Sequence, residues 1–183
     1  MNNQFEKQSD AQEFIDVISQ VASAFALAQT HNCNSAINNT LKIIGDYVDA
    51  DRSYMFKYDF EKGTTSNTHE YCVKGITKEI DNLQHIPLTK IPDWVKTHKA
   101  NISMNIHDVS KLDKDDEVSK ILEPQFVKSL LTIPLFRNDK LFGFLGFDSV
   151  KEKHNYTRFE QTVLTEYSKL LIDLLERLKI DTN

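Results

Sequence analysis

The sequence has few cysteines, glycines and prolines, and it has no long apolar run. Its 183 residues include two cysteines, five glycines and four prolines. Two cysteines are too few for a disulfide framework and fit a reducing compartment. No stretch approaches the roughly eighteen apolar residues of a membrane-spanning helix, and the N-terminus lacks the basic and apolar regions of a secretory signal. We therefore expect a cytoplasmic protein that does not contact a membrane.

Basic residues are outnumbered by acidic ones. Lysine and arginine together number 22 against 27 acidic residues, which gives a formal net charge of -5. Because a nucleic-acid-binding surface needs a clustered basic face, nucleic acid is not an expected partner. The length and the hydrophobic share of 40% predict one globular domain with a sizeable core and some additional helix.

A pair of apolar runs near the C-terminal end is the strongest strand signal. Residues 129–136 and 141–147 are rich in Ile, Leu and Phe and flank a polar break at residues 137–140. This pattern predicts a hairpin, and its two apolar faces place the hairpin in the middle of a sheet covered on both sides. Gly143 and Gly146 interrupt the second strand, which indicates a close approach to the backbone by a helix or a ligand, and we expect the helix.

Helical patterns are found at both ends of the chain. Asp10 with Glu13, and Thr157 with Glu160, have the spacing of capping boxes, and the second pair opens a helix over residues 157–179. The apolar positions of the two helices are Phe14, Ile18, Val21, Phe25 and Ala28 in the first, and Leu164, Tyr167, Leu171, Leu174 and Leu178 in the last. Such stripes can also form a coiled-coil seam, so we expect a parallel homodimer through the two helices.

The middle of the chain alternates between regular and irregular stretches. A second helix carries Ile37, Leu41, Ile44 and Val48 on one face, and strands are expected at residues 52–58, 64–73 and 101–106. The regular pattern fades over residues 75–100, where a short helix near residues 91–98 carries Trp94, and residues 108–123 form a charged excursion with a loop and a short helix. A long irregular segment inside a compact domain is usually functional or mobile.

Several of these stretches resemble the GAF domain, a bacterial small-molecule sensor fold related to PAS domains. The resemblance is carried by ADRSYMFKYD at residues 50–59, by SLLTIPL and LFGFLGFDS within residues 129–149, and by YTRFE at the start of the last helix. SNTHEYCVKGI at residues 66–76 and IDNLQHIPL at residues 80–88 resemble the subgroup found in bacterial sensor kinases and diguanylate cyclases.

The resemblance implies an α/β fold with a central antiparallel sheet of five to six strands. The terminal helices would cover one face, and a roof of loops and short helices would cover the other. It also implies three parts: residues 1–19 as the N-terminal part of a long dimerisation or signalling helix, residues 20–178 as the GAF domain, and residues 179–183 as a tail or the start of a linker.

Five residues are candidates for binding a small molecule under this roof. Tyr54, Phe56, Asn67, His69 and Trp94 combine apolar area with a few polar groups, the composition of a small-molecule pocket. The GAF pattern implies that the first two lie on one strand, Asn67 and His69 on the next, and Trp94 on the roof. The alternative is that all five are core residues whose polar ends are satisfied within the fold.

Catalytic and metal chemistry find little support in the sequence. His69 and Cys72 have H-x-x-C spacing, but zinc sites need further ligands, commonly as two close pairs. GAF-fold enzymes exist, the free methionine sulfoxide reductases, and they use cysteines in the roof segment. Residues 75–123 contain no cysteine here, which weakens this enzyme reading and a covalent bilin reading alike. We expect no metal, no catalytic residue and no enzyme, with a reductase as a distant alternative.

Two functions therefore remain open. The first is a sensor that binds an unknown small molecule and passes a change to a helical dimer, with a kinase or a diguanylate cyclase as the output domain. The second is a ligand-free dimerisation or interaction module whose pocket is filled by side chains. The sequence identifies neither the ligand nor a cofactor.

Overall fold

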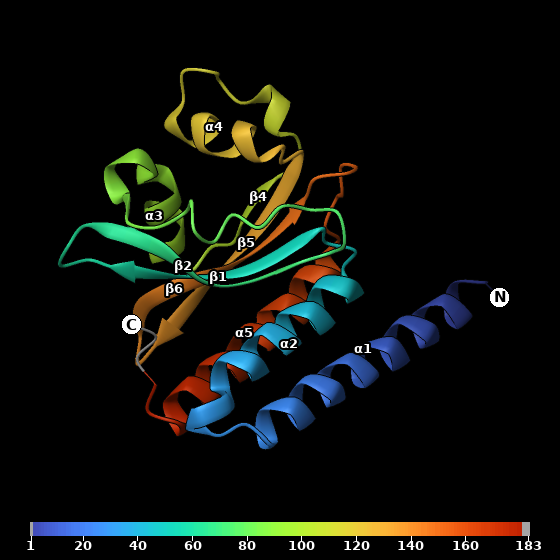
Figure 1. The fold of residues 1–183 in the computed structure, drawn as a ribbon. Helices are drawn as coiled ribbons and strands as arrows, with labels where there is room; N and C mark the ends of the chain where they lie inside the picture. The colour runs from blue at the N-terminus through green and yellow to red at the C-terminus, as the bar shows by residue number, and fades with distance from the viewer. Residues whose placement is uncertain (1, 181–183) are drawn as a thin grey trace.

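A six-stranded antiparallel sheet forms the centre of the protein. The computed structural model describes residues 2–180, and the side chains of residues 11–180. The strand order is β3-β2-β1-β6-β5-β4. The strands are β1 (Arg52–Asp59), β2 (Thr64–Cys72), β3 (Ile86–Pro87), β4 (Met104–Ile106), β5 (Ser129–Arg137) and β6 (Lys140–Ser149). Figure 1 shows helices on one face of this sheet and the short roof helices on the other, as the sequence predicted.

Three long helices make up the helical layer. They are α1 (Asn2–Ala26), α2 (Cys33–Tyr47) and α5 (Arg158–Arg177). The predicted capping box of α5 is confirmed, since the Thr157 side chain accepts from the Glu160 backbone while the Glu160 side chain accepts from the Thr157 backbone. The box predicted at Asp10 and Glu13 is wrong, because α1 begins at Asn2 and both residues lie inside the helix.

The apolar stripe of α5 is buried within the chain. Leu164, Tyr167 and Leu171 are fully buried, and Leu174 is nearly so, in one core with Val21 and other residues of α1, α2 and the sheet. The prediction that this stripe forms a seam with a second copy is therefore wrong for these positions. They cover the chain's own sheet, which the helical periodicity alone could not distinguish from a partner.

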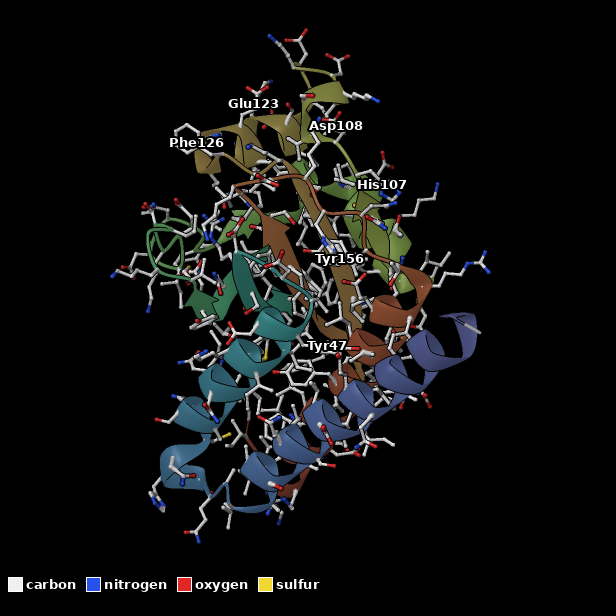
Figure 2. All side chains as sticks on the ribbon, turned by 90° about the vertical axis from the view of Figure 1, so that its right-hand side faces the viewer. Tyr47, His107, Asp108, Glu123, Phe126 and Tyr156 are labelled. Atoms are coloured by element: carbon white, nitrogen blue, oxygen red, sulfur yellow. The ribbon has the colours of Figure 1, made fainter. Side chains whose placement is uncertain are left out.

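The roof consists of short helical segments between the strands. They are η2 (Leu88–Lys90), α3 (Pro92–Lys99), η3 (Val109–Lys111), α4 (Glu117–Leu122) and η4 (Glu123–Gln125). A second apolar cluster lies between them and the sheet. Figure 2 labels Glu123 and Phe126 at the outer end of the roof, and the Phe126 side chain is 77% exposed.

The predicted hairpin of β5 and β6 is confirmed in the interior of the sheet, where β6 pairs with both β1 and β5. The expected helix over its glycines is not found. A Cβ added at Gly146 would lie 1.9 Å from the Tyr54 ring, and one at Gly143 would lie 2.0 Å from the Phe56 carbonyl oxygen. The close approach therefore comes from the neighbouring strand β1.

Two further observations complete the fold. The strand expected over residues 101–106 is shorter, because Asn101 has a left-handed φ of 57° and only Met104–Ile106 pair with β5. Within residues 2–180, no helix is long and apolar enough to cross a membrane.

Candidate functional site

An aromatic cleft lies between the sheet and the roof. Tyr54 and Phe56 are two positions apart on β1 and therefore share the roof face, where Phe144 of β6 joins them. The Phe56 and Phe144 rings stack with centroids 4.8 Å apart, and Trp94 of α3 lies 5.8 Å from Phe144. The full lining is Tyr54, Phe56, Thr65, Leu83, Ile86, Ile91, Trp94, Ile121, Leu122, Gln125 and Phe144.

The cleft is narrow. Its volume is about 40 Å³, whereas pockets for drug-sized molecules typically measure about 300–1,000 Å³. Trp94, which lines the cleft, has a buried donor without a partner, since no group within the described residues accepts from its Nε1. A ligand larger than a few water molecules therefore requires the roof to move outward.

A buried polar cluster lies next to this cleft. Arg52 Nη1 donates to Asp148 Oδ2 at 3.0 Å and to Gln125 Oε1 at 3.3 Å, while Tyr54 Oη donates to Asp148 Oδ1 at 2.7 Å. Burial raises the pKa of the Asp148 carboxyl to about 6, although Arg52 and the Tyr54 hydroxyl oppose the shift. Tyr54 and Gln125 belong to both the cluster and the cleft, so they connect the two.

Glu70 completes the cluster on the side of β2. Its carboxylate lies 3.7 Å from Arg52 Nε and accepts from the backbone N–H groups of Glu79 and Ile80 at 3.0–3.1 Å. Burial raises the pKa of Glu70, opposed by these backbone hydrogen bonds and by Arg52. Arg52 Nη2 also donates to the Thr77 carbonyl at 3.2 Å. The beginning of the roof segment is thus tied to the sheet through buried charge.

The helix α3 is tied to the sheet by a separate buried chain of hydrogen bonds. His98 Nδ1 lies 2.9 Å from Tyr58 Oη on β1, and His98 Nε2 lies 2.8 Å from Thr132 Oγ1 on β5. Burial lowers the pKa of His98 to about 3, so the imidazole is neutral at physiological pH. This brace fixes the helix that carries Trp94.

The structure brings four of the five sequence-predicted site residues to the roof face. Tyr54, Phe56 and Trp94 line the cleft. Asn67 is paired with Phe56 across β1 and β2 and so shares its face, where its side-chain amide is buried with no partner among the described residues. Whether these residues bind a ligand is part of the proposal below.

His69 lies on the opposite face. It is paired with Met55, which belongs to the core under the helices, and its Nε2 lies 3.2 Å from Asn34 Oδ1 of α2. The register shifts between Met55 and Phe56, so Thr68 is an extra residue in β2 and the period-two alternation breaks there. His69 instead borders an open groove of about 800 Å³ at the sheet edge. It cannot orient a ligand in the aromatic cleft.

The sequence analysis missed the polar cluster. Its members Arg52, Glu70, Gln125 and Asp148 come from four separate elements. A signal for two of them was present, because Arg52 opens one strand and Asp148 nearly closes another. When two strands pair antiparallel, the start of one lies beside the end of the other. Arg52 and Asp148 are paired in this way.

The two cysteines are free thiols on different elements, and Arg52 beside Cys72 does not outweigh the burial of that thiol. Cys33 is buried at the start of α2, and Cys72 lies at the end of β2. Burial and the Glu70 carboxylate raise the pKa of Cys72 to about 11, so at neutral pH it is a thiol and a poor nucleophile. Within the described residues, no three His, Cys, Asp or Glu side chains converge as a metal site would require.

Comparisons with known proteins agree with this architecture. A sequence profile of the GAF domain matches residues 32–172. The chain is 29% identical over 148 residues to the methanogenesis regulatory histidine kinase FilI of Methanothrix harundinacea, a match that covers 78% of this chain and 16% of the kinase.

Solved structures share the fold at low sequence identity. The phycoerythrobilin-bound GAF domain of a cyanobacterial phytochrome superposes with a TM-score of 0.74 at 16% identity, covering 92% of this chain and 97% of that one. The free methionine-R-sulfoxide reductase of Neisseria meningitidis, in complex with its substrate, gives a TM-score of 0.68 at 16% identity, covering 91% and 90%. With its profile match, six-stranded sheet and roofed cleft, the chain belongs to the GAF domain family.

Proposed function

We propose that this GAF domain is a regulatory sensor that binds a small molecule between the sheet and the roof. The observation that carries the proposal is the aromatic cleft next to a buried polar cluster, lined by Trp94, whose buried indole N–H has no partner among the described residues. A buried donor without a partner costs about 1–3 kcal/mol, and a ligand that accepts from it would recover that free energy. Tyr54, Phe56 and Trp94 would contact the ligand, and Asn67 lies on the same face beside Phe56.

The element that opens in this proposal is α4 with η4. The segment before α3 is bonded to Glu70, and α3 is braced by His98. The α4–η4 end reaches the polar cluster through Gln125, whose contact with Arg52 is the long one at 3.3 Å. It ends at Phe126, a bulky residue with a left-handed φ of 59°, a conformation that such side chains rarely adopt. Outward movement of this end would enlarge the cleft without breaking the two stronger ties.

The output would travel through the helical layer. We propose residues 1–19 as the N-terminal part of a long signalling and dimerisation helix, residues 20–178 as the sensor domain and residues 179–183 as a tail or the start of a linker. Because the matched relative is a histidine kinase of which this chain spans 16%, a kinase is the proposed output domain. With the α5 stripe used internally, a homodimer would form through the outward sides of α1 and α5, where Ile15 and Phe159 are exposed.

One observation favours the second candidate, a ligand-free interaction module. Side chains nearly fill the cleft, which leaves about 40 Å³. In that case the aromatic cluster would be a core, and the roof would not move. A reductase activity has no such support, since the Cys72 thiol is held protonated and the roof contains no cysteine.

A screen with Trp94 as the reporter separates the two candidates. Trp94 is the single tryptophan of the chain, so its emission reports on the cleft without interference. A sensor should show a saturable change of emission with at least one compound of a broad metabolite library, together with slower amide exchange in residues 117–127. Trp94→Phe should weaken binding of that compound, measured by calorimetry, while Phe60→Ala on the exposed turn should not. If no compound changes either signal, the interaction module is the correct function.

A further inference from the structure

The polar cluster next to the cleft holds more negative than positive charge. Asp148 and Glu70 supply two carboxylates, and Arg52 supplies one guanidinium, with all three side chains almost completely buried. Both carboxylates share this one guanidinium, so the ionised cluster carries a net charge of one negative unit. Since charges interact strongly where water is excluded, this site favours an additional cation nearby.

Tyr54 and Gln125 line the cleft and also bond to the charged cluster, so they connect the negative charge to the cleft. The Tyr54 hydroxyl donates a hydrogen bond to Asp148 Oδ1, so the lone pairs of its oxygen remain available to accept. A hydroxyl that donates to a carboxylate is polarised and accepts more strongly. The Gln125 side-chain oxygen, held by a single long bond from Arg52, is a second acceptor at the same end of the cleft. An N–H group of a ligand would find hydrogen-bond acceptors there.

The walls of the cleft suit a cation as well. Tyr54, Phe56, Trp94 and Phe144 present aromatic rings, and no charged side chain is among the residues that line it. Aromatic faces attract organic cations, and tryptophan does so most strongly. The partnerless Trp94 N–H adds a requirement for one acceptor on the ligand. The net charge of the cluster and the aromatic walls thus favour a cation, and the Trp94 N–H favours an acceptor on the same ligand.

We propose that the ligand of this cleft is a small organic cation, an amine or ammonium compound that also carries an oxygen acceptor. This inference rests on the proposed sensor function and narrows it. The ammonium group binds at the Tyr54 and Gln125 end, above Asp148, and the ligand oxygen accepts from Trp94 Nε1. A carboxylic acid meets the uncompensated carboxylate at the same end and is disfavoured, and a neutral alcohol leaves that charge uncompensated.

The test uses compounds that share one carbon skeleton and differ in charge. Amino alcohols of two to six carbons, the corresponding diols and the corresponding hydroxy acids are titrated into the wild-type chain at pH 7.5, with Trp94 emission and calorimetry as readouts. At least one amino alcohol should bind about tenfold more tightly than its diol, which corresponds to about 1.4 kcal/mol. Its hydroxy acid should bind more weakly than the diol.

Two variants assign the preference to the cluster. Asp148→Asn removes the charge and keeps an acceptor for Tyr54, so it should abolish the preference for the amino alcohol. Asp115→Asn makes the same change of charge on the exposed part of the roof and should leave the preference intact. If Asp148→Asn does not fold, as judged by circular dichroism, the comparison of the three compound series in the wild type still decides.

The outcomes distinguish this inference from the sensor proposal. Binding of a diol or a hydroxy acid as tight as that of the amino alcohol would refute the preference for a cationic ligand. It would leave the proposal that the cleft binds a ligand intact. Failure of every amino alcohol to bind would also refute it. The sensor function itself falls only if the broad metabolite screen shows no binding either.

Discussion

Replacing Gly146 by alanine should destabilise the protein strongly. Gly146 is paired with Tyr54, and a Cβ there would lie 1.9 Å and 2.2 Å from two carbon atoms of the Tyr54 ring. The ring must move away, which breaks the 2.7 Å bond from the Tyr54 hydroxyl to the buried Asp148 carboxylate. Both the packing and the hydrogen bond are lost together.

The magnitude follows from these two losses. Overpacking of a core costs about 1–3 kcal/mol, and loss of a hydrogen bond to a charged group costs about 1.5–3 kcal/mol. A total of about 3 kcal/mol or more should lower the melting temperature of a chain of this length by about 6–12 °C. The measurement is thermal and urea unfolding followed by circular dichroism.

A double-mutant cycle with Tyr54→Ala provides the control. Once the ring is absent, the methyl group of Gly146→Ala has space, so the second substitution should cost less than about 1 kcal/mol in that background. The reasoning is refuted if Gly146→Ala alone leaves the melting temperature unchanged. It is refuted as well if the substitution costs the same with and without the Tyr54 ring.

Three further predictions concern the charged and nucleophilic groups. Burial lowers the pKa of His69 to about 4, so the unfolded state binds the proton first, and this group alone should lower the stability by up to about 1.4 kcal/mol per pH unit as the pH drops from about 6.5 to 4. His98, whose pKa is lowered to about 3, adds to the same slope, so His69→Gln should reduce the slope in urea unfolding without abolishing it. Arg52→Met leaves two buried carboxylates without their cation and should cost about 3–5 kcal/mol by the same assay, so an unchanged stability would show that the ion pairs are dispensable. The double variant Cys33→Ser with Cys72→Ser should keep fold and ligand affinity with a loss of at most about 2 kcal/mol, and rapid modification of native Cys72 by a thiol reagent at pH 7.5 would contradict its raised pKa.

The resemblance to GAF domains predicted the layers of this fold, including the roof. The strands of the β5–β6 hairpin and the common face of Tyr54 and Phe56 follow from local patterns in the chain, and the capping box follows from the spacing of Thr157 and Glu160. These patterns are properties of single elements, so they can be read without knowing which elements are neighbours.

The details that failed depend on pairing between elements. The face of His69 is reversed by one extra residue in β2, and a β-bulge leaves little trace in a single sequence. Position 146 needs a glycine because the ring of Tyr54, a residue 92 positions earlier in the chain, lies against it. Only the strand register brings these two residues together. The burial of Leu171 against the chain's own sheet has the same origin, because a helical stripe does not specify what covers it.

Amide hydrogen exchange of the roof is the most direct test of the central claim, that the aromatic cleft is a ligand pocket opened by α4 and η4. The wild-type chain is compared with and without the compound that changes Trp94 emission most in the metabolite screen. Our account predicts that exchange slows in residues 117–127 and changes little in α3, which the His98 brace already holds. Equal slowing throughout the chain, or none in residues 117–127, would contradict it.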